Sequence, residues 1–296
     1  MKIKELLSKK EPMLSFEVFP PKTDDLYETV EEAAEQIAML NPDFMSVTYG
    51  AGGGTSKHTL NIAKDIKEKY GVPMLAHLTC VSSSKETVHE RINDMKNAGI
   101  ENIMALRGDI PQNISASEHF PGHYRYAVDL IREIKLSGAD FCIGAACYPE
   151  VHPESDCQNS DIAHLKEKVD AGCDFLTTQM FFDNNLLYNF LYKIREAGIT
   201  VPVVAGIMPI TNGNQVERAI KLSGSHMPHK FKSIVDKFGH NGAAMKQAGI
   251  AYATEQIVDL IANGVNAIHV YTMNKPSVAA QIQSSLSEII PKRSKK

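Results

Sequence analysis

The chain has 296 residues, of which 43% are hydrophobic and 22% charged, and its formal net charge is −4. This weak acidity argues against nucleic-acid binding, which needs a basic face, and no stretch reaches the roughly 18 apolar residues of a membrane span. The N-terminus lacks the apolar core and cleavage site of a signal peptide and predicts a short amphipathic helix with Leu6 and Leu7 inward. Five scattered cysteines without a Cys-x-x-Cys pair fit free thiols in a reducing compartment, so we expect a soluble cytoplasmic protein.

Short β-rich runs alternate with longer helical patterns almost from end to end. The predicted strands are 14–19, 44–48, 74–79, 102–107, 141–146, 175–179, 203–207 and 267–271. Apolar residues at helical spacing predict helices at 26–40, 58–70, 86–98, 124–136, 161–171 and 186–197, and two or three more within 214–264. About eight strand–helix units predict an α/β protein, a single-domain (β/α)8 TIM barrel over 1–296 with a short N-terminal helix and a basic C-terminal tail. An open doubly wound sheet is the alternative.

The first predicted strand carries a carboxylate inside an apolar run. Leu14, Phe16 and Val18 share one face, which belongs against helices, so Glu17 on the other face points into the barrel lumen. An isolated buried carboxylate is costly, so its presence needs a reason. Other strands also end in polar residues, and a barrel builds its active site at that end. These residues are Ser46, Thr48, His77, Thr79, Arg107, Thr177, Gln179, His269 and Tyr271.

Five local motifs have a simpler explanation beside a functional one. The spacing of the glycine-rich loop 50–55 fits neither of the phosphate-binding motifs Gly-x-Gly-x-x-Gly and Gly-x4-Gly-Lys-Ser/Thr. We interpret this loop as a flexible turn at the functional face. The histidines of HFPGH, 119–123, have the four-residue spacing of a metal pair, but the Phe-Pro-Gly between them cannot continue a helix. We therefore predict no metal site there or at SHMPHK. AACYPEVHPE, 145–154, is either a rigid surface turn or a ligand wall, and its place after a strand favours the wall. ALRGD, 105–109, holds either a structural ion pair or part of a site.

The polar groups at the strand ends include an acid, an amide, an imidazole and a guanidinium, without an evident nucleophile. No Ser-His-Asp order and no carboxylate pair of the glycosidase kind stands out. Such a set suits chemistry that a bound cofactor carries.

Eight segments, in order between 15 and 275, resemble the methylenetetrahydrofolate reductases, flavin-dependent enzymes of one-carbon metabolism. They are SFEVFPPK, MSVTYGAGGG, AHLTC, MALRGD, AACYPEVHPE, KVDAGCDFLTTQMFFD, GIMPITN and HVYTMNK. The resemblance implies a (β/α)8 barrel that binds FAD noncovalently. NADH or NADPH would reduce the flavin and leave, and 5,10-methylenetetrahydrofolate would then accept the hydride as 5-methyltetrahydrofolate for methionine synthesis. We also expect a homo-oligomer.

The resemblance also implies roles for individual residues. Glu17 matches the general acid that protonates the folate N10, and Asp109 matches a catalytic aspartate that binds the pterin beside the flavin. The implied substrate contacts are Thr48, Asp109, Gln179, Gln215 and Lys275. The implied FAD contacts are Tyr49, Ala51, His77, Arg107, Gly108, Asp109, Ala127, Tyr148, His152, Asp161 and Lys168.

The chain departs from the family pattern at a few positions. His164 and Glu167 stand where Asn and Arg are frequent, Lys275 replaces a common arginine, and Ala219 stands where some members stack an aromatic on the substrate. Because the chain ends after the barrel, we expect no regulatory domain and no control by S-adenosylmethionine. The alternatives are another flavin barrel, such as a proline dehydrogenase-like oxidase, and a non-catalytic flavin- or folate-binding barrel.

Overall fold

The computed structural model describes residues 1–21, 23–49, 56–110 and 124–291. In this part of the chain, parallel strands pair in chain order into one closed barrel. They are β1 (Met13–Val18), β2 (Met45–Val47), β3 (Met74–Thr79), β4 (Asn102–Leu106), β5 (Cys142–Cys147), β6 (Phe175–Thr178), β7 (Val203–Ile207) and β8 (Ala267–Tyr271). Because β1 pairs with both β2 and β8, the sheet closes on itself. The predicted (β/α)8 barrel is confirmed, and the open doubly wound sheet is wrong.

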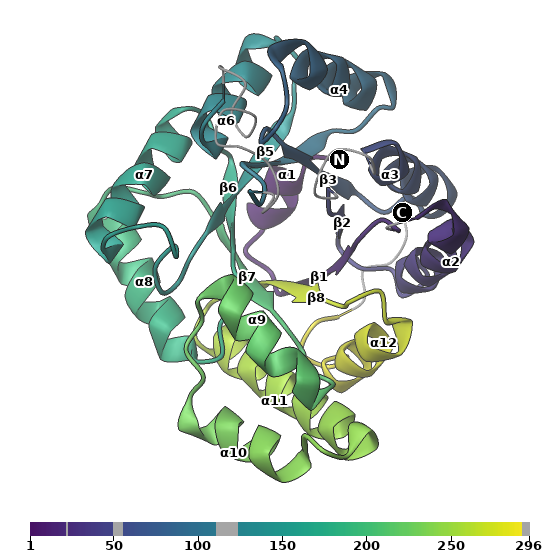
Figure 1. The fold of residues 1–296 in the computed structure, drawn as a ribbon, viewed down its shortest axis with the longest axis vertical. Coiled ribbons are helices and arrows are strands. Elements are labelled where there is room, and N and C mark those ends of the chain that lie inside the picture. Colours follow the sequence, from purple (N-terminus) through teal and green to yellow (C-terminus); the bar gives the residue numbers. More distant parts are fainter. Residues whose placement is uncertain (22, 50–55, 111–123, 292–296) are drawn as a thin grey trace.

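Helices surround the strands as an outer ring (Figure 1). They are α2 (Tyr27–Ala38), α3 (Ser56–Tyr70), α4 (Lys85–Asn97), α6 (Ala127–Leu136), α7 (Gln158–Asp170), α8 (Asn184–Glu196), α11 (Gly242–Ala262) and α12 (Pro276–Ser285). The six helices predicted before residue 200 are confirmed, with ends that differ by less than one turn. The sequence did not predict α12, whose buried residues are Val278, Ala279 and Ile282.

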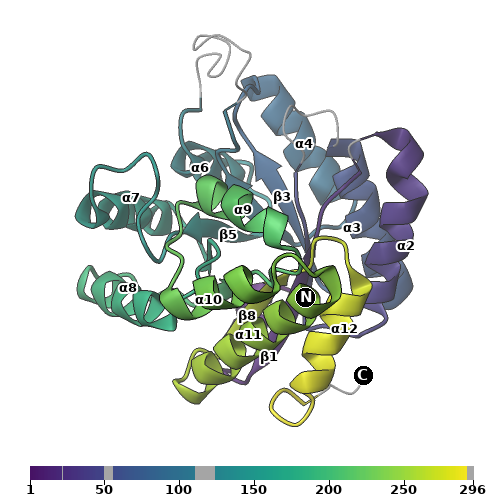
Figure 2. The same ribbon diagram turned by 60° about the horizontal axis from the view of Figure 1, so that its bottom comes forward.

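The connection between β7 and β8 is the longest excursion of the described chain. It holds the 3-10 turn η2 (Gly213–Gln215), α9 (Val216–Ser223), α10 (His229–Phe238) and α11. Two or three helices were predicted in this region, and the structure has three α-helices there. Helices α9 and α10 come forward together in Figure 2. They share an apolar cluster of their own, in which Phe182 stacks on Phe231 with ring centroids 4.8 Å apart. Ala219 is buried in this cluster.

A short helix, α1 (Ile3–Leu7), closes the N-terminal end of the barrel. Its buried Ile3, Leu6 and Leu7 pack with apolar residues at the starts of the strands. The Ile3 backbone N–H donates to Asn102 Oδ1 at 2.8 Å, and Asn102 Nδ2 donates to the Met74 carbonyl at 3.0 Å. This end of the lumen is therefore lined mainly by apolar residues together with Asn102, and most of the polar side chains of the lumen lie nearer the opposite, C-terminal end of the strands.

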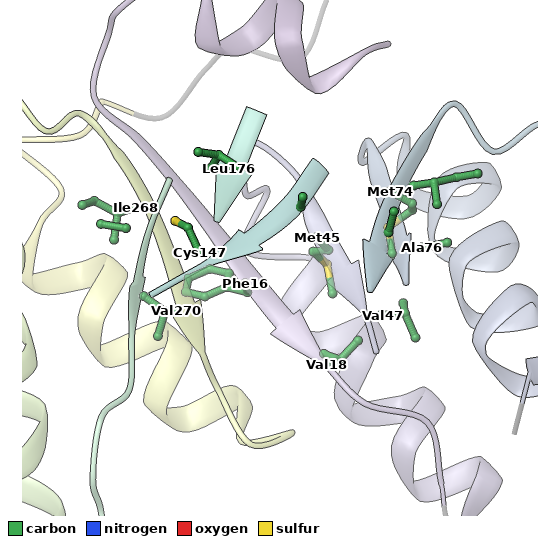
Figure 3. Packing of buried hydrophobic residues seen from close by; sticks show 14 of the residues in the cluster. Phe16, Val18, Met45, Val47, Met74, Ala76, Cys147, Leu176, Ile268 and Val270 are labelled. Carbon is green, nitrogen blue, oxygen red and sulfur yellow. The ribbon is translucent and has the colours of Figure 1, made fainter. Parts of the chain in front are cut away.

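The larger apolar core lies between the strands and the helices. Phe16 and Val18 from β1 lie beside Met45 and Val47 from β2 in this layer (Figure 3). These side chains pack against the helices, as the alternation of apolar residues predicted for β1, and Phe16 is fully buried. The intervening residues of the same strands therefore point into the lumen. No helix of the described residues is long and apolar enough to cross a membrane.

Candidate active site

Glu17 projects into the lumen near the C-terminal end of β1, as predicted. Its side chain is 18% exposed. Its Oε2 lies 3.3 Å from Ser46 Oγ, 3.7 Å from His77 Nε2 and 3.9 Å from His269 Nε2. The barrel register produces this grouping, since Glu17 stands opposite Ser46 on β2 and Tyr271 on β8. The inward orientation is confirmed, and the role of Glu17 stays a prediction.

A hydrogen-bonded line runs from Glu17 through Ser46 and His269 to Ser15. Ser15 Oγ donates to the Ile268 carbonyl at 2.9 Å, so its 2.8 Å contact with His269 Nδ1 requires the imidazole to donate. His269 Nε2 lies 2.9 Å from Ser46 Oγ. A hydroxyl has one hydrogen, so Ser46 donates either to His269 or to Glu17.

Both arrangements of this line hold the same number of protons. If Ser46 donates to His269, its contact with Glu17 needs a proton on the carboxyl group. If Ser46 donates to Glu17, its contact with His269 needs a second proton on the imidazole. In both arrangements the Ser46 hydroxyl connects the Glu17 carboxyl to the His269 imidazole. The sequence placed Ser46 and His269 at strand ends but assigned them no role in the site.

His77 is buried in the same lumen, on β3. Desolvation lowers its pKa from the ordinary 6.5 to about 4, against the opposing attraction of Glu17. Its distance from Glu17 would suit an ion pair, but burial keeps the imidazole neutral near pH 7, so the contact is a dipolar one. His77 Nε2 accepts or donates no hydrogen bond within the described residues.

The neutral state of His77 predicts acid sensitivity of the fold. Between pH 6.5 and about 4 the unfolded chain binds a proton at this position that the folded chain does not. The free energy of unfolding should thus fall by about 3 kcal/mol across this window as the pH is lowered. Urea unfolding at a series of pH values measures this loss. His77→Leu should remove that part of the pH dependence, the exposed His164→Leu should retain it, and identical profiles for His77→Leu and wild type would contradict the assignment.

Arg107 forms its ion pair with Glu154 and not with Asp109, the nearby anion in ALRGD. Its guanidinium forms a fork with Glu154, with Nη1–Oε2 at 2.5 Å and Nη2–Oε1 at 2.6 Å. Ile103 and Ala105 on β4 point outward to the helices, and Arg107 has the same parity along the chain. Arg107 therefore lies at the rim of the barrel, and its side chain does not point into the lumen. Asp109 is exposed beside it. The sequence missed Glu154 as a partner because the pair joins two separate strand-end loops.

The segment AACYPEVHPE is anchored to α7 and to its own aromatic pair. The Tyr148 and His152 rings meet edge-on with centroids 4.6 Å apart, and the His152 backbone N–H donates to Asp161 Oδ2 at 3.0 Å. Lys168 Nζ donates to the Ala146 carbonyl at 3.0 Å, and burial lowers the pKa of this lysine. These contacts stiffen the segment and support its interpretation as a ligand wall.

Electrostatics links the predicted cofactor residues from three elements. Arg107 and Asp161 both act on Lys168, and burial, with a smaller contribution from Asp109, raises the pKa of Tyr148 to about 12. Gly108 lies between them with φ +91°, and a Cβ there would come within 2.7 Å of Val81 Cγ1. Ala127, the first residue of α6, is buried.

The remaining predicted residues are distributed around the mouth. Gln179 Oε1 accepts from the Met180 backbone N–H at 2.9 Å, and Lys275 Nζ donates to Thr211 Oγ1 at 2.9 Å. The Thr48 carbonyl accepts from Thr59 Oγ1 at 2.9 Å. The next residue, Tyr49, lies under the Arg91 guanidinium, 5.1 Å from the ring centroid. His164 and Glu167 are exposed on α7, and Ala51, loop 50–55 and HFPGH lie outside the described residues.

Three buried polar atoms of the described residues lack a hydrogen-bond partner and lie at or near the C-terminal end of the barrel: His77 Nε2, Thr177 Oγ1 and Gln215 Oε1. Such an atom costs about 1–3 kcal/mol when it stays unsatisfied, so each needs an explanation, and a bound polar ligand supplies one. Within the same residues, no group of three or more His, Cys, Asp and Glu side chains could hold a metal ion.

Comparison with known proteins identifies the family. The family model for methylenetetrahydrofolate reductase matches residues 2–287. The 5,10-methylenetetrahydrofolate reductase of Pectobacterium carotovorum subsp. carotovorum is 36% identical over 273 residues, which cover 92% of this chain and 89% of the relative. The chain belongs to the methylenetetrahydrofolate reductase family. The resemblance in the eight segments is thereby confirmed.

Family members of different length match this chain. Methylenetetrahydrofolate reductase (NADH) 1 of Arabidopsis thaliana is 34% identical over 298 residues, which cover 97% of this chain and 50% of the relative. The chain thus spans about half the length of this plant member of the methylenetetrahydrofolate reductase family and about nine tenths of the bacterial one. Among solved structures, an uncharacterized protein from Clostridium thermocellum that binds two copies of 5-methyl-5,6,7,8-tetrahydrofolic acid has a TM-score of 0.64. It is 13% identical, and the match covers 97% of this chain and 99% of that one, so it shows a shared fold.

Proposed function

We propose that this chain reduces 5,10-methylenetetrahydrofolate to 5-methyltetrahydrofolate with NADH or NADPH, using bound FAD. The observation that carries the proposal is the Glu17 carboxyl, held in the barrel lumen by Ser46 and beside two histidines, in a member of this reductase family. A barrel of the same fold that binds 5-methyl-5,6,7,8-tetrahydrofolic acid adds support for a folate as the ligand. A cytoplasmic location, homo-oligomeric assembly and a role in methionine synthesis stay predictions from the sequence.

Glu17 would act as the general acid for ring opening. Its carboxyl proton would pass to N10 of the folate as the bond from N10 to the methylene carbon breaks. The carbon stays on N5 as an iminium group, which is a hydride acceptor. A positioned acid contributes about 10²–10⁴ in rate. After the transfer, the carboxylate can accept from Ser46, whose hydroxyl connects it to His269.

The FAD would supply a hydride acceptor for NADH or NADPH and a hydride donor for the folate, which bind in turn. The charge and rigidity of the rim suit such a group, since the cations Arg107 and Lys168 flank the stiff Tyr148–His152 segment. The residues that we propose to hold FAD are Tyr49, Ala51, His77, Arg107, Gly108, Asp109, Ala127, Tyr148, His152, Asp161 and Lys168.

The folate contacts would come from other parts of the mouth. Asp109 at the rim would bind the pterin and orient it, and the buried, unpartnered Gln215 Oε1 could accept from a folate N–H. Lys275 would offer its ammonium group to an acidic or carbonyl oxygen of the folate, with Thr211 as its present partner. Thr48 and Gln179 complete the proposed substrate set.

Two half-reactions followed by flavin absorbance test this function. The protein, reconstituted with FAD under anaerobic conditions, should bleach with NADH or NADPH and regain its absorbance when methylenetetrahydrofolate is added. Bleaching without recovery would indicate another acceptor, as expected of a different flavin barrel. A preparation that does not bind FAD would favour a non-catalytic barrel and contradict the proposal.

A further inference from the structure

The seam between the first and last strands continues beyond the last backbone pair. The register of β1 and β8 ends at Glu17 opposite Tyr271. Thr272 Oγ1 then donates to the Glu17 carbonyl at 2.7 Å. The Asn274 amide binds both backbone groups of Phe19: its Oδ1 accepts from the N–H and its Nδ2 donates to the carbonyl, each at 2.9 Å. Side chains thus replace the backbone partners that a longer β8 would offer.

Phe19 is the last residue of this segment whose backbone can both donate and accept a hydrogen bond. Pro20 and Pro21 follow it, and neither has a backbone N–H. Asn274 therefore holds the final residue of the β1 segment that can both donate and accept through its backbone. Glu17 lies two residues before this point.

The backbone that presents the Asn274 amide is strained. Met273 and Asn274 have φ angles of +54° and +53°, and two consecutive left-handed residues other than glycine are rare. Asparagine tolerates this conformation better than most residues, whereas methionine gains nothing from it. Strain of this kind persists only where the surroundings enforce it, and it gathers at functional sites. The turn brings the Lys275 N–H to the Thr272 carbonyl at 3.1 Å and starts α12.

We propose that Asn274 is a positioning residue that fixes the spacing between Glu17 and Lys275. One amide joins the segment with the acid to the segment with the cation, and Lys275 is further held by Thr211. Its effect on catalysis rests on the proposed function, in which Glu17 serves the N10 end of the reacting ring and Lys275 contacts the same folate. Loss of the amide would let the two segments separate, without removing any group that touches the substrate.

Two variants separate the hydrogen bonds from the backbone strain. Asn274→Ala loses both bonds, and Asn274→Gly loses both bonds while favouring the left-handed conformation. In both, we expect re-oxidation of the reduced flavin by methylenetetrahydrofolate to slow about 10–100-fold with a raised KM for the folate, because a misplacement of about 1 Å has this effect. Reduction by NADH should stay near the wild-type rate, since it uses neither Glu17 nor Lys275.

Asn41 provides the matched control. It has a left-handed φ of +58° in the loop before β2, at the opposite end of the barrel. Asn41→Ala places alanine in the same left-handed backbone conformation as Asn274→Ala and should leave both half-reactions at wild-type rates. A purely structural role for Asn274 would instead slow both half-reactions together, and wild-type folate kinetics in Asn274→Gly would show that only the backbone conformation matters. Either result overturns the proposal.

Amide hydrogen exchange at Phe19 gives a readout that does not depend on the reaction. The Phe19 N–H should exchange faster in Asn274→Ala and Asn274→Gly than in wild type, and unchanged exchange would refute the contact itself. If the wild-type protein bleaches with NADH but fails to reduce the folate, the proposed function fails even where the exchange result holds. The two failures are therefore distinguishable.

Discussion

Glu17→Gln is expected to slow folate reduction by about 10²–10⁴-fold while FAD binding and bleaching by NADH persist. Glutamine has the same shape and can still accept from Ser46 Oγ, which lies 3.3 Å from the native carboxyl oxygen. It has no acidic proton to pass to N10, so ring opening loses its acid. Anaerobic stopped-flow absorbance measures the reductive and oxidative steps separately.

The matched control is a glutamate with the same charge and an exposed position. Glu68 on α3 lies exposed on the outside of the barrel, with Lys64 Nζ 4.0 Å from its Oε1. Glu68→Gln should leave both half-reactions at wild-type rates. Normal folate turnover by Glu17→Gln would show that Glu17 is not the general acid.

Phe16→Ala is expected to lower the free energy of unfolding by about 3–5 kcal/mol. Phe16 is 0% exposed and fills the layer between β1 and the outer helices. Its removal leaves a cavity in a closely packed core, which cannot collapse without moving a strand that is paired on both sides. Urea unfolding followed by circular dichroism measures the change.

Phe238→Ala provides the comparison, since Phe238 at the end of α10 is 37% exposed and should cost far less stability. Phe16 and Glu17 are neighbours on one strand, and we expect them to serve different purposes, stability and chemistry. We expect Phe16→Ala to affect stability and Glu17→Gln to affect folate chemistry. Equal losses of stability in Phe16→Ala and Phe238→Ala would contradict the assigned packing.

Local patterns in the sequence were sufficient to predict the barrel. The bounds predicted for β3, β7 and β8 match the structure, and a Gly, Pro or Asn residue stands shortly before each of these apolar runs. The alternation of Phe16 and Glu17 predicted which face is buried against helices, since side chains alternate strictly along a strand. Helix α12 was not predicted because only three residues of this short helix are buried, which is too few to produce a strong periodic signal.

The partners within the site depend on register, which local patterns do not specify. Ser46 meets Glu17 because β1 and β2 align at that rung, and His269 meets Ser15 because β8 closes against β1, 254 residues away in sequence. The Arg107–Glu154 fork likewise joins two loops through the barrel geometry. The residue types could therefore be predicted, whereas the hydrogen bonds between them required the three-dimensional structure.

A crystal structure of the protein with FAD and 5-methyltetrahydrofolate would test the central claim most directly. We predict that the folate binds at the C-terminal mouth of the barrel, with the Glu17 carboxyl within hydrogen-bonding reach of it, directly or through one water. A folate bound elsewhere on the barrel, or a Glu17 side chain turned away from the bound folate, would contradict this prediction.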